Sequence, residues 1–193
     1  MKKRILLWII LLLPYLGLYC GWEMYKHTVA EIANSTFVII SKEDMTLSVY
    51  NYKGMKMSSY PIACGRNFGD KEIQGDMKTP EGVFNICDIQ NSSEWSHDFK
   101  DGKGKITGAY GPFFIRLSVP NQSGIGIHGT HNPNSIGTRI TEGCVRMHNE
   151  DLTKLVKQIK VGSVVAILPS EQDVTDKTDS CIIEDKQVKN MQK

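Results

Sequence analysis

Beyond residue 36, only one stretch of the chain has the spacing of apolar residues that an α-helix requires. Its apolar residues recur at i, i+3, i+4 and i+7, as Leu152, Leu155, Val156 and Ile159. Asn149 is suited to cap the start of this helix, and Gly162 is suited to end it. The other apolar segments are short and bounded by turn residues, which is typical of strands. The sequence therefore predicts a mainly β domain with one packed helix.

The predicted strands fall between residues 36 and 168. They cover residues 37–40, 46–50, 55–63, 83–89, 113–118, 125–128 and 164–168. The stretches 65–82 and 91–111 are rich in Gly, Asp, Asn and Lys, so we predict them as loops. A loop as long as residues 91–111 is often functional, so it forms either a flap over the site or a surface excursion with packed aromatic residues.

The amino terminus differs from the rest of the chain. Lys2, Lys3 and Arg4 precede an uncharged run from Ile5 to Trp22, which is long enough to span a bilayer. No small-residue cleavage site follows, which favours a retained transmembrane signal-anchor, and the basic cluster is expected to stay in the cytoplasm. We therefore expect a single-pass protein of the cytoplasmic membrane whose domain lies on the outer, extracytoplasmic side. The expected divisions are residues 1–22 (basic residues and anchor), 23–35 (juxtamembrane segment), 36–168 (domain) and 169–193 (polar, disordered tail).

Composition excludes some classes of function. The 193 residues include 23 basic and 21 acidic ones, and a net charge of +2 gives no footprint for a nucleic-acid partner.

Five cysteines are too few and too scattered for a disulfide framework. Apart from Cys20 and Cys144, only Cys64, Cys87 and Cys181 remain, so at most one bridge could form among them.

The residues that can carry chemistry gather between positions 128 and 146. His128 begins a polar loop, Cys144 follows sixteen residues later, and Arg146 comes two residues after the cysteine. A cysteine attacks as a thiolate, and a nearby imidazole can take its proton. Gly143 lets the backbone turn, so the amides of Gly143 and Cys144 could face a developing oxyanion. Arg146 could favour the thiolate or hold a substrate carboxylate. This pattern indicates a cysteine nucleophile with a histidine base.

A zinc site is the alternative that these residue types allow. His128, His131, Cys144 and His148 are potential zinc ligands at short spacings. An arginine beside the cysteine is a poor neighbour for a dication, so we expect no metal.

The stretch IHGTHNPNSIGTRITEGCVRMHNEDL, residues 127–152, resembles the signature of the L,D-transpeptidases, the YkuD-type peptidoglycan cross-linking enzymes that include ErfK- and YbiS-like domains. The element Thr79-Pro80-Glu81-Gly82 before a strand is also usual in that family, and it extends the resemblance to residues 36–168. Many members carry a histidine at the position of Glu142, so this chain departs from the pattern there.

The resemblance implies a sandwich-like L,D-transpeptidase fold and a reaction in two halves. Cys144 would attack a peptidoglycan stem peptide and release D-alanine, and an amine of a second stem would then form a 3→3 cross-link. His128 would act as base and then acid, oriented by the carbonyl of Gly129. Substrate would bind Thr130, His131, Thr141 and Arg146, and no cofactor is implied. The alternatives are an L,D-carboxypeptidase, a sortase-like transpeptidase and a non-catalytic wall-binding β domain.

Overall fold

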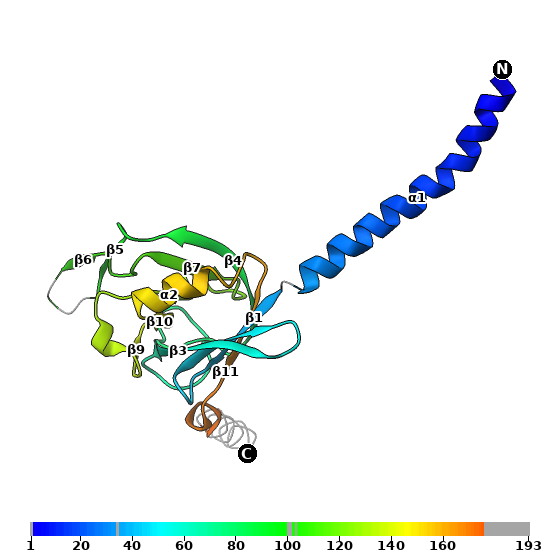
Figure 1. The fold of residues 1–193 in the computed structure, drawn as a ribbon. Helices are drawn as coiled ribbons and strands as arrows, with labels where there is room; N and C mark the ends of the chain where they lie inside the picture. The colour runs from blue at the N-terminus through cyan, green and yellow to red at the C-terminus, as the bar shows by residue number, and fades with distance from the viewer. Residues whose placement is uncertain (1, 34, 100–101, 103, 176–193) are drawn as a thin grey trace, which may run out of the picture. The chain divides into compact units, whose positions relative to one another are not determined.

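The computed structural model describes the backbone of residues 2–33, 35–99, 102 and 104–175, and side chains from residue 15 onward within these ranges. The chain divides into two units, Met1–Ser35 and Thr36–Lys193 (Figure 1). The first unit is one helix, α1 (Lys2–Ala33). Residues 5–14 of the predicted anchor lie outside the residues whose side chains are described. Within the described part of the chain, no helix is both long enough and apolar enough to cross a membrane.

The second unit is mainly β, as the strand pattern predicts. Its nine-stranded sheet has the order β10-β8-β7-β4-β11-β1-β2-β3-β9, and β10 also pairs with β3. Because of this additional pairing, β10, at one end of the strand order, is hydrogen-bonded to β3, near the other end. The strands are β1 (Thr36–Ser41), β2 (Thr46–Asn51), β3 (Lys56–Gly65), β4 (Gly82–Asn91), β7 (Phe113–Leu117), β8 (Gly126–His128), β9 (Arg139–Thr141), β10 (Val145–Met147) and β11 (Val164–Leu168).

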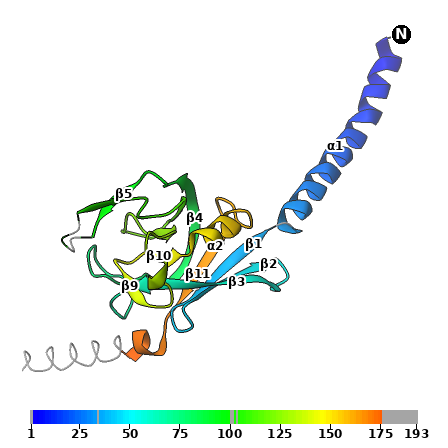
Figure 2. The same cartoon turned by 60° about the vertical axis from the view of Figure 1, so that its left-hand side comes forward.

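The core lies between these strands and helix α2 (Asn149–Val156), which is packed among them in both views (Figures 1 and 2). Leu152 and Leu155 of α2 are fully buried with side chains from the sheet such as Val38, Ile62 and Ile127. Burying apolar surface in this way contributes about 25 cal/mol per Å² to stability. The apolar stripe therefore explains why this face of α2 is buried in the core.

Three local predictions differ from the structure. Helix α2 ends at Val156, one turn before Ile159 and well before the predicted stop at Gly162. Residues 91–111 are not only loop, because they contain a hairpin of β5 (Ser96–Asp98) and β6 (Lys105–Thr107), whose strands are too short to show a period. His148, not Asn149, is the N-cap residue of α2, because the Asn149 side chain is bound to the backbone of Thr130. A short 3-10 helix, η1 (Pro133–Ser135), interrupts the loop after His128.

The start of the predicted tail is packed against the domain rather than disordered. Asp173 is fully buried, and it accepts hydrogen bonds from the Gly69 amide at 2.7 Å and from Arg139 at 2.8 Å. Lys42, also buried, lies 3.3 Å from Asp173 and 2.8 Å from Glu81. The polar composition of the segment predicted disorder because it gave no sign of these buried contacts. Residues 176–193 of the predicted tail lie outside the described residues.

Replacing Asp173 by alanine should destabilise the domain by about 3–5 kcal/mol, because it removes the carboxylate that the buried Lys42 and the partly buried Arg139 share. Burial alone would raise the pKa of Asp173, but hydrogen bonds from Ser170 and Gly69 and the charge of Lys42 hold that pKa below its usual value. A depressed carboxyl pKa stabilises the fold above the unfolded value, about 3.9, and this contribution is lost as the pH falls below it. Urea denaturation at pH 7 and pH 3 measures both effects.

The matched control is Lys154→Gln, which removes an exposed ion pair with Asp151. It should change the free energy of unfolding by at most about 0.5 kcal/mol. An Asp173→Ala variant as stable as this control would contradict a structural role for residues 170–173.

Candidate active site

Two neighbouring strands bring the predicted base and nucleophile together. β8 and β10 are parallel, and Val145 pairs with Ile127 while Arg146 pairs with His128. His128 is the last residue of β8, and Cys144 immediately precedes β10. The Cys144 thiol donates a hydrogen bond to the Gly124 carbonyl at 3.3 Å. His128 therefore ends one strand, and Cys144 directly precedes the strand that pairs with it.

His128 is held as a neutral imidazole. Its Nδ1 lies 2.7 Å from the carbonyl oxygen of Gly129, which can only accept, so Nδ1 carries the proton and Nε2 can accept one. The ring stacks on Phe114 at 5.7 Å and meets the edge of Tyr110 at 4.9 Å. Burial lowers the pKa of His128 to about 3. The geometry gives the imidazole a free acceptor nitrogen at neutral pH.

Cys144 is a neutral thiol at rest. Burial raises the pKa of the Cys144 thiol to about 11, although a hydrogen bond from the Gly126 amide and the charges of Lys71 and Arg146 lower it. Glu142 acts in the opposite direction and raises the same pKa. A thiol with this pKa needs a base at the moment of attack, because the free thiolate is scarce at neutral pH.

The Thr141 hydroxyl binds the backbone of both Gly143 and Cys144. Thr141 Oγ1 accepts a hydrogen bond from the Gly143 amide at 3.2 Å and donates one to the Cys144 carbonyl at 2.6 Å. Thr141 is only 3% exposed. The structure therefore differs from two expectations. The Gly143 amide, an oxyanion candidate in the sequence, is occupied. Thr141, which the resemblance assigns to substrate binding, supports the backbone instead. The Cys144 amide remains as the oxyanion candidate.

Arg146 is a buried cation with a free donor. It is 5% exposed, its Nη1 donates to Ser135 Oγ at 3.0 Å, and its guanidinium lies 5.7 Å from the Phe99 ring centroid. Among the described residues, its Nε is a buried nitrogen with no hydrogen-bond partner. A guanidinium in this state suits an anionic group such as a carboxylate.

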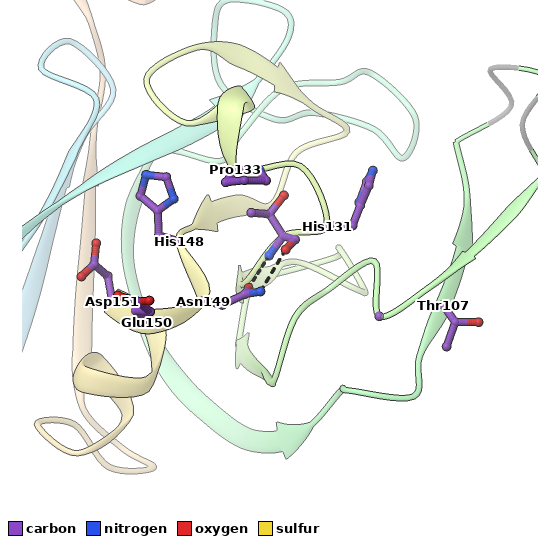
Figure 3. A pocket seen from close by; sticks show the side chains of 9 residues that line it. Thr107, His131, Pro133, His148, Asn149, Glu150 and Asp151 are labelled. Carbon is purple, nitrogen blue, oxygen red and sulfur yellow. Dashed lines mark hydrogen bonds between the residues drawn. The ribbon is translucent and has the colours of Figure 1, made fainter.

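Thr130 and His131 line a pocket beside the site. The Asn149 side chain holds both the amide and the carbonyl of Thr130, at 2.8 and 3.0 Å (Figure 3). His131 is exposed and packs on Phe99 at 5.0 Å. The pocket has a volume of about 730 Å³, and neither Cys144 nor His128 lines it. Its lining residues are Thr107, Gly108, Thr130, His131, Pro133, His148, Asn149, Glu150 and Asp151.

The segment of residues 91–111 contributes contacts that sequence reasoning missed. His97 lies 3.3 Å from the carboxylate of Glu142, and its other ring nitrogen lies 2.9 Å from the Tyr110 hydroxyl. Tyr110 in turn packs against His128. The only signal in the sequence was the presence of aromatic residues in an otherwise polar stretch. These contacts link the segment to the residues around the nucleophile.

The sequence left open a zinc site and a disulfide bridge, and both can be compared with the described part of the chain. No three of its His, Cys, Asp and Glu side chains form a group that could hold a metal ion. Cys20, Cys64, Cys87 and Cys144 are all free thiols, and Cys181 lies outside the described residues.

Comparisons with known proteins agree with the resemblance seen in the sequence. Residues 35–167 match the model of the YkuD family, the L,D-transpeptidase catalytic domain. The chain is 33% identical over 130 residues to the putative L,D-transpeptidase YkuD of Bacillus subtilis, covering 67% of this chain and 63% of that protein. It is 31% identical over 132 residues to the Bacillus licheniformis protein of the same name, covering 68% and 65%. The match thus spans less than two thirds of either relative.

Solved structures show the same fold. L,D-transpeptidase 3 from Mycobacterium tuberculosis, in complex with a faropenem-derived adduct, superposes with a TM-score of 0.53 at 15% identity. The superposition covers 69% of this chain and 60% of that chain.

Proposed function

The chain belongs to the family of L,D-transpeptidase catalytic domains, and on that premise we propose that it forms 3→3 cross-links in peptidoglycan through a thioacyl-enzyme on Cys144. The observation that carries the proposal is the pairing of β8 with β10, which sets His128, with Nδ1 tied to Gly129, beside the strand that follows Cys144. The family supports the reaction class, and the geometry supports the roles of the individual residues.

In the first half-reaction, His128 Nε2 takes the proton of the Cys144 thiol as the sulfur attacks the carbonyl of the third stem residue. A carbon–sulfur bond forms, and the carbonyl oxygen carries negative charge beside the Cys144 amide. The bond to the nitrogen of D-alanine then breaks, and that nitrogen takes the proton from His128. The products are D-alanine and a thioester on Cys144.

In the second half-reaction, a side-chain amine of another stem attacks the thioester. The new amide bond replaces the carbon–sulfur bond, and the amine's proton passes by way of His128 to the sulfur. Water competes with the amine, so transfer requires the amine to be held in place; positioning can provide effective molarities of roughly 10⁵ M or more. The segment of residues 91–111 contributes Thr107 and Gly108 to the pocket beside Thr130, which supports it as one wall of the acceptor site.

Substrate recognition is assigned to Arg146. Its buried guanidinium has an Nε donor without a hydrogen-bond partner among the residues that the structure describes, so we assign it a carboxylate of the stem peptide. His131 and Thr130 both line the pocket, and we assign them to contact with the second stem.

The test of the proposal is the fate of purified disaccharide-tetrapeptide incubated with the full-length chain in detergent. We expect dimers that have lost one D-alanine, separated and identified by mass, because a held amine outcompetes water. Tripeptide alone, even at high acceptor concentration, would move the assignment to an L,D-carboxypeptidase. Binding of the substrate without any turnover would favour the wall-binding alternative.

For localisation, we propose a single-pass protein of the cytoplasmic membrane, with the domain outside. The basis is the sequence alone, where Lys2, Lys3 and Arg4 precede the uncharged residues 5–22. Protease added to intact spheroplasts should degrade the domain and leave a small membrane-bound fragment. A chain that is protected in intact spheroplasts and digested only after lysis would refute this topology.

A further inference from the structure

Thr79 lies in the loop before β4 and contacts the residue that precedes the nucleophile. It is fully buried, its Oγ1 donates a hydrogen bond to the carbonyl of Gly143 at 2.9 Å, and the same oxygen accepts one from the amide of Gly65 at 2.7 Å. The residue thus bridges the end of β3 and the residue before Cys144. Nothing in the chemistry described above uses this hydroxyl.

Two threonine hydroxyls occupy three of the four backbone groups of Gly143 and Cys144. Thr141 binds the Gly143 amide and the Cys144 carbonyl, and Thr79 binds the Gly143 carbonyl. The fourth group is the Cys144 amide. That amide shares a planar peptide unit with the Gly143 carbonyl and points in the opposite direction. The bond from Thr79 therefore fixes the direction of the Cys144 N–H.

Close packing holds Thr79 in place. A Cβ on Gly65 would lie 2.6 Å from both the Met77 carbonyl oxygen and the Thr79 nitrogen. A Cβ on Gly143, whose φ is +131°, would lie 2.8 Å from the Lys78 carbonyl oxygen. Residues 77–79 therefore press against both glycines, and the hydroxyl of Thr79 has little freedom to move. Gly143 itself has the backbone freedom to rotate, so an external partner is needed to hold its carbonyl.

We propose that Thr79 is a positioning residue for acyl transfer, which aims the Cys144 amide at the oxyanion by holding the Gly143 carbonyl. This inference rests on the proposed function and adds to it a residue outside the motif of residues 127–152. It predicts that Thr79 matters for steps that form an oxyanion and not for other reactions of the same thiol.

Two kinds of reagent, acylating and alkylating, separate oxyanion-forming steps from other reactions of the thiol in the full-length chain. Faropenem and a p-nitrophenyl ester acylate a thiol through a tetrahedral oxyanion, whereas iodoacetamide alkylates it by displacing iodide, with no oxyanion. Thr79→Val keeps the shape and removes the hydroxyl. It should slow acylation by roughly 10²-fold, the loss typical of one oxyanion donor, and change the alkylation rate by less than about twofold. Thr79→Ser restores the hydroxyl and should recover most of the acylation rate.

The matched control is Thr36→Val, which removes a threonine bond to the backbone carbonyl of Gln158 on the β1 side of the domain. It should change neither rate. The proposal is overturned if Thr79→Val acylates like the wild type, if it loses both rates in proportion, or if neither acyl donor modifies the wild type. Selective loss of acylation in a protein that does not dimerise disaccharide-tetrapeptide would refute the proposed function and leave the role of Thr79 standing.

Discussion

Replacing Cys144 by alanine should abolish turnover, with a loss on the order of 10⁶-fold, because alanine has no nucleophile to form the acyl-enzyme. Cys144 is the one described cysteine that directly precedes β10 and lies among the charges of Lys71, Glu142 and Arg146. Intact-protein mass spectrometry should show one faropenem adduct on the wild type and none on Cys144→Ala. Faropenem is a suitable probe because its β-lactam carbonyl can acylate a nucleophilic thiol.

The control for Cys144 is Cys87→Ala, since the Cys87 thiol is exposed and its hydrogen bond goes only to the Arg116 carbonyl. This variant should keep both the adduct and the turnover of the wild type. An adduct of unchanged stoichiometry on Cys144→Ala would show that the reactive thiol is elsewhere, and the mechanism proposed above would then be wrong.

The sequence predicts most of the fold because periodicity reports burial directly. The alternation in residues 46–50 and the apolar run in residues 164–168 become β2 and β11, each flanking β1. The spacing of apolar residues also predicts the packed face of α2. Prediction from this spacing fails where the structure depends on only a few residues, as in β5 and β6, or on polar contacts between distant segments.

The buried ion cluster is the clearest case of such a failure. Lys42, Asp173 and Arg139 are ordinary surface types, and nothing local distinguishes Asp173 from the other acids near the end of the chain. Only their convergence in space shows that the segment after β11 belongs to the domain. Composition alone predicted a disordered tail, because the composition of a segment does not show which distant residues its side chains will contact.

In the candidate site, too, some residues could be predicted from the sequence and others could not. Residue types and spacing select His128 and Cys144 as candidates, because the proposed chemistry needs a thiol and a base. The supporting contacts could not be predicted in this way, because Thr79, Thr141 and Asn149 act through the backbone of other residues. Such roles depend on where a hydroxyl or amide lies after folding. The sequence suggested substrate contact for Thr141, and the structure instead places its hydroxyl between two backbone groups.

Replacing His128 by alanine should lower the acylation rate at pH 7 by roughly 10²–10⁴-fold, the usual contribution of a general base. The pH dependence makes this prediction specific. With the pKa of His128 at about 3 and that of the Cys144 thiol at about 11, the wild type keeps the same protonation states between pH 5 and 9, so its rate should be nearly constant there.

Without the imidazole, only the fraction of Cys144 present as thiolate can react. That fraction grows about tenfold per pH unit below the thiol pKa, so the rate of His128→Ala should rise with the same slope and approach the wild type in alkaline solution. The control is His27→Ala, which lies in α1 and should reproduce the flat wild-type profile. A wild-type rate that climbs as steeply as that of His128→Ala would mean that the thiol ionises unaided, and His128 would then have no role as its base.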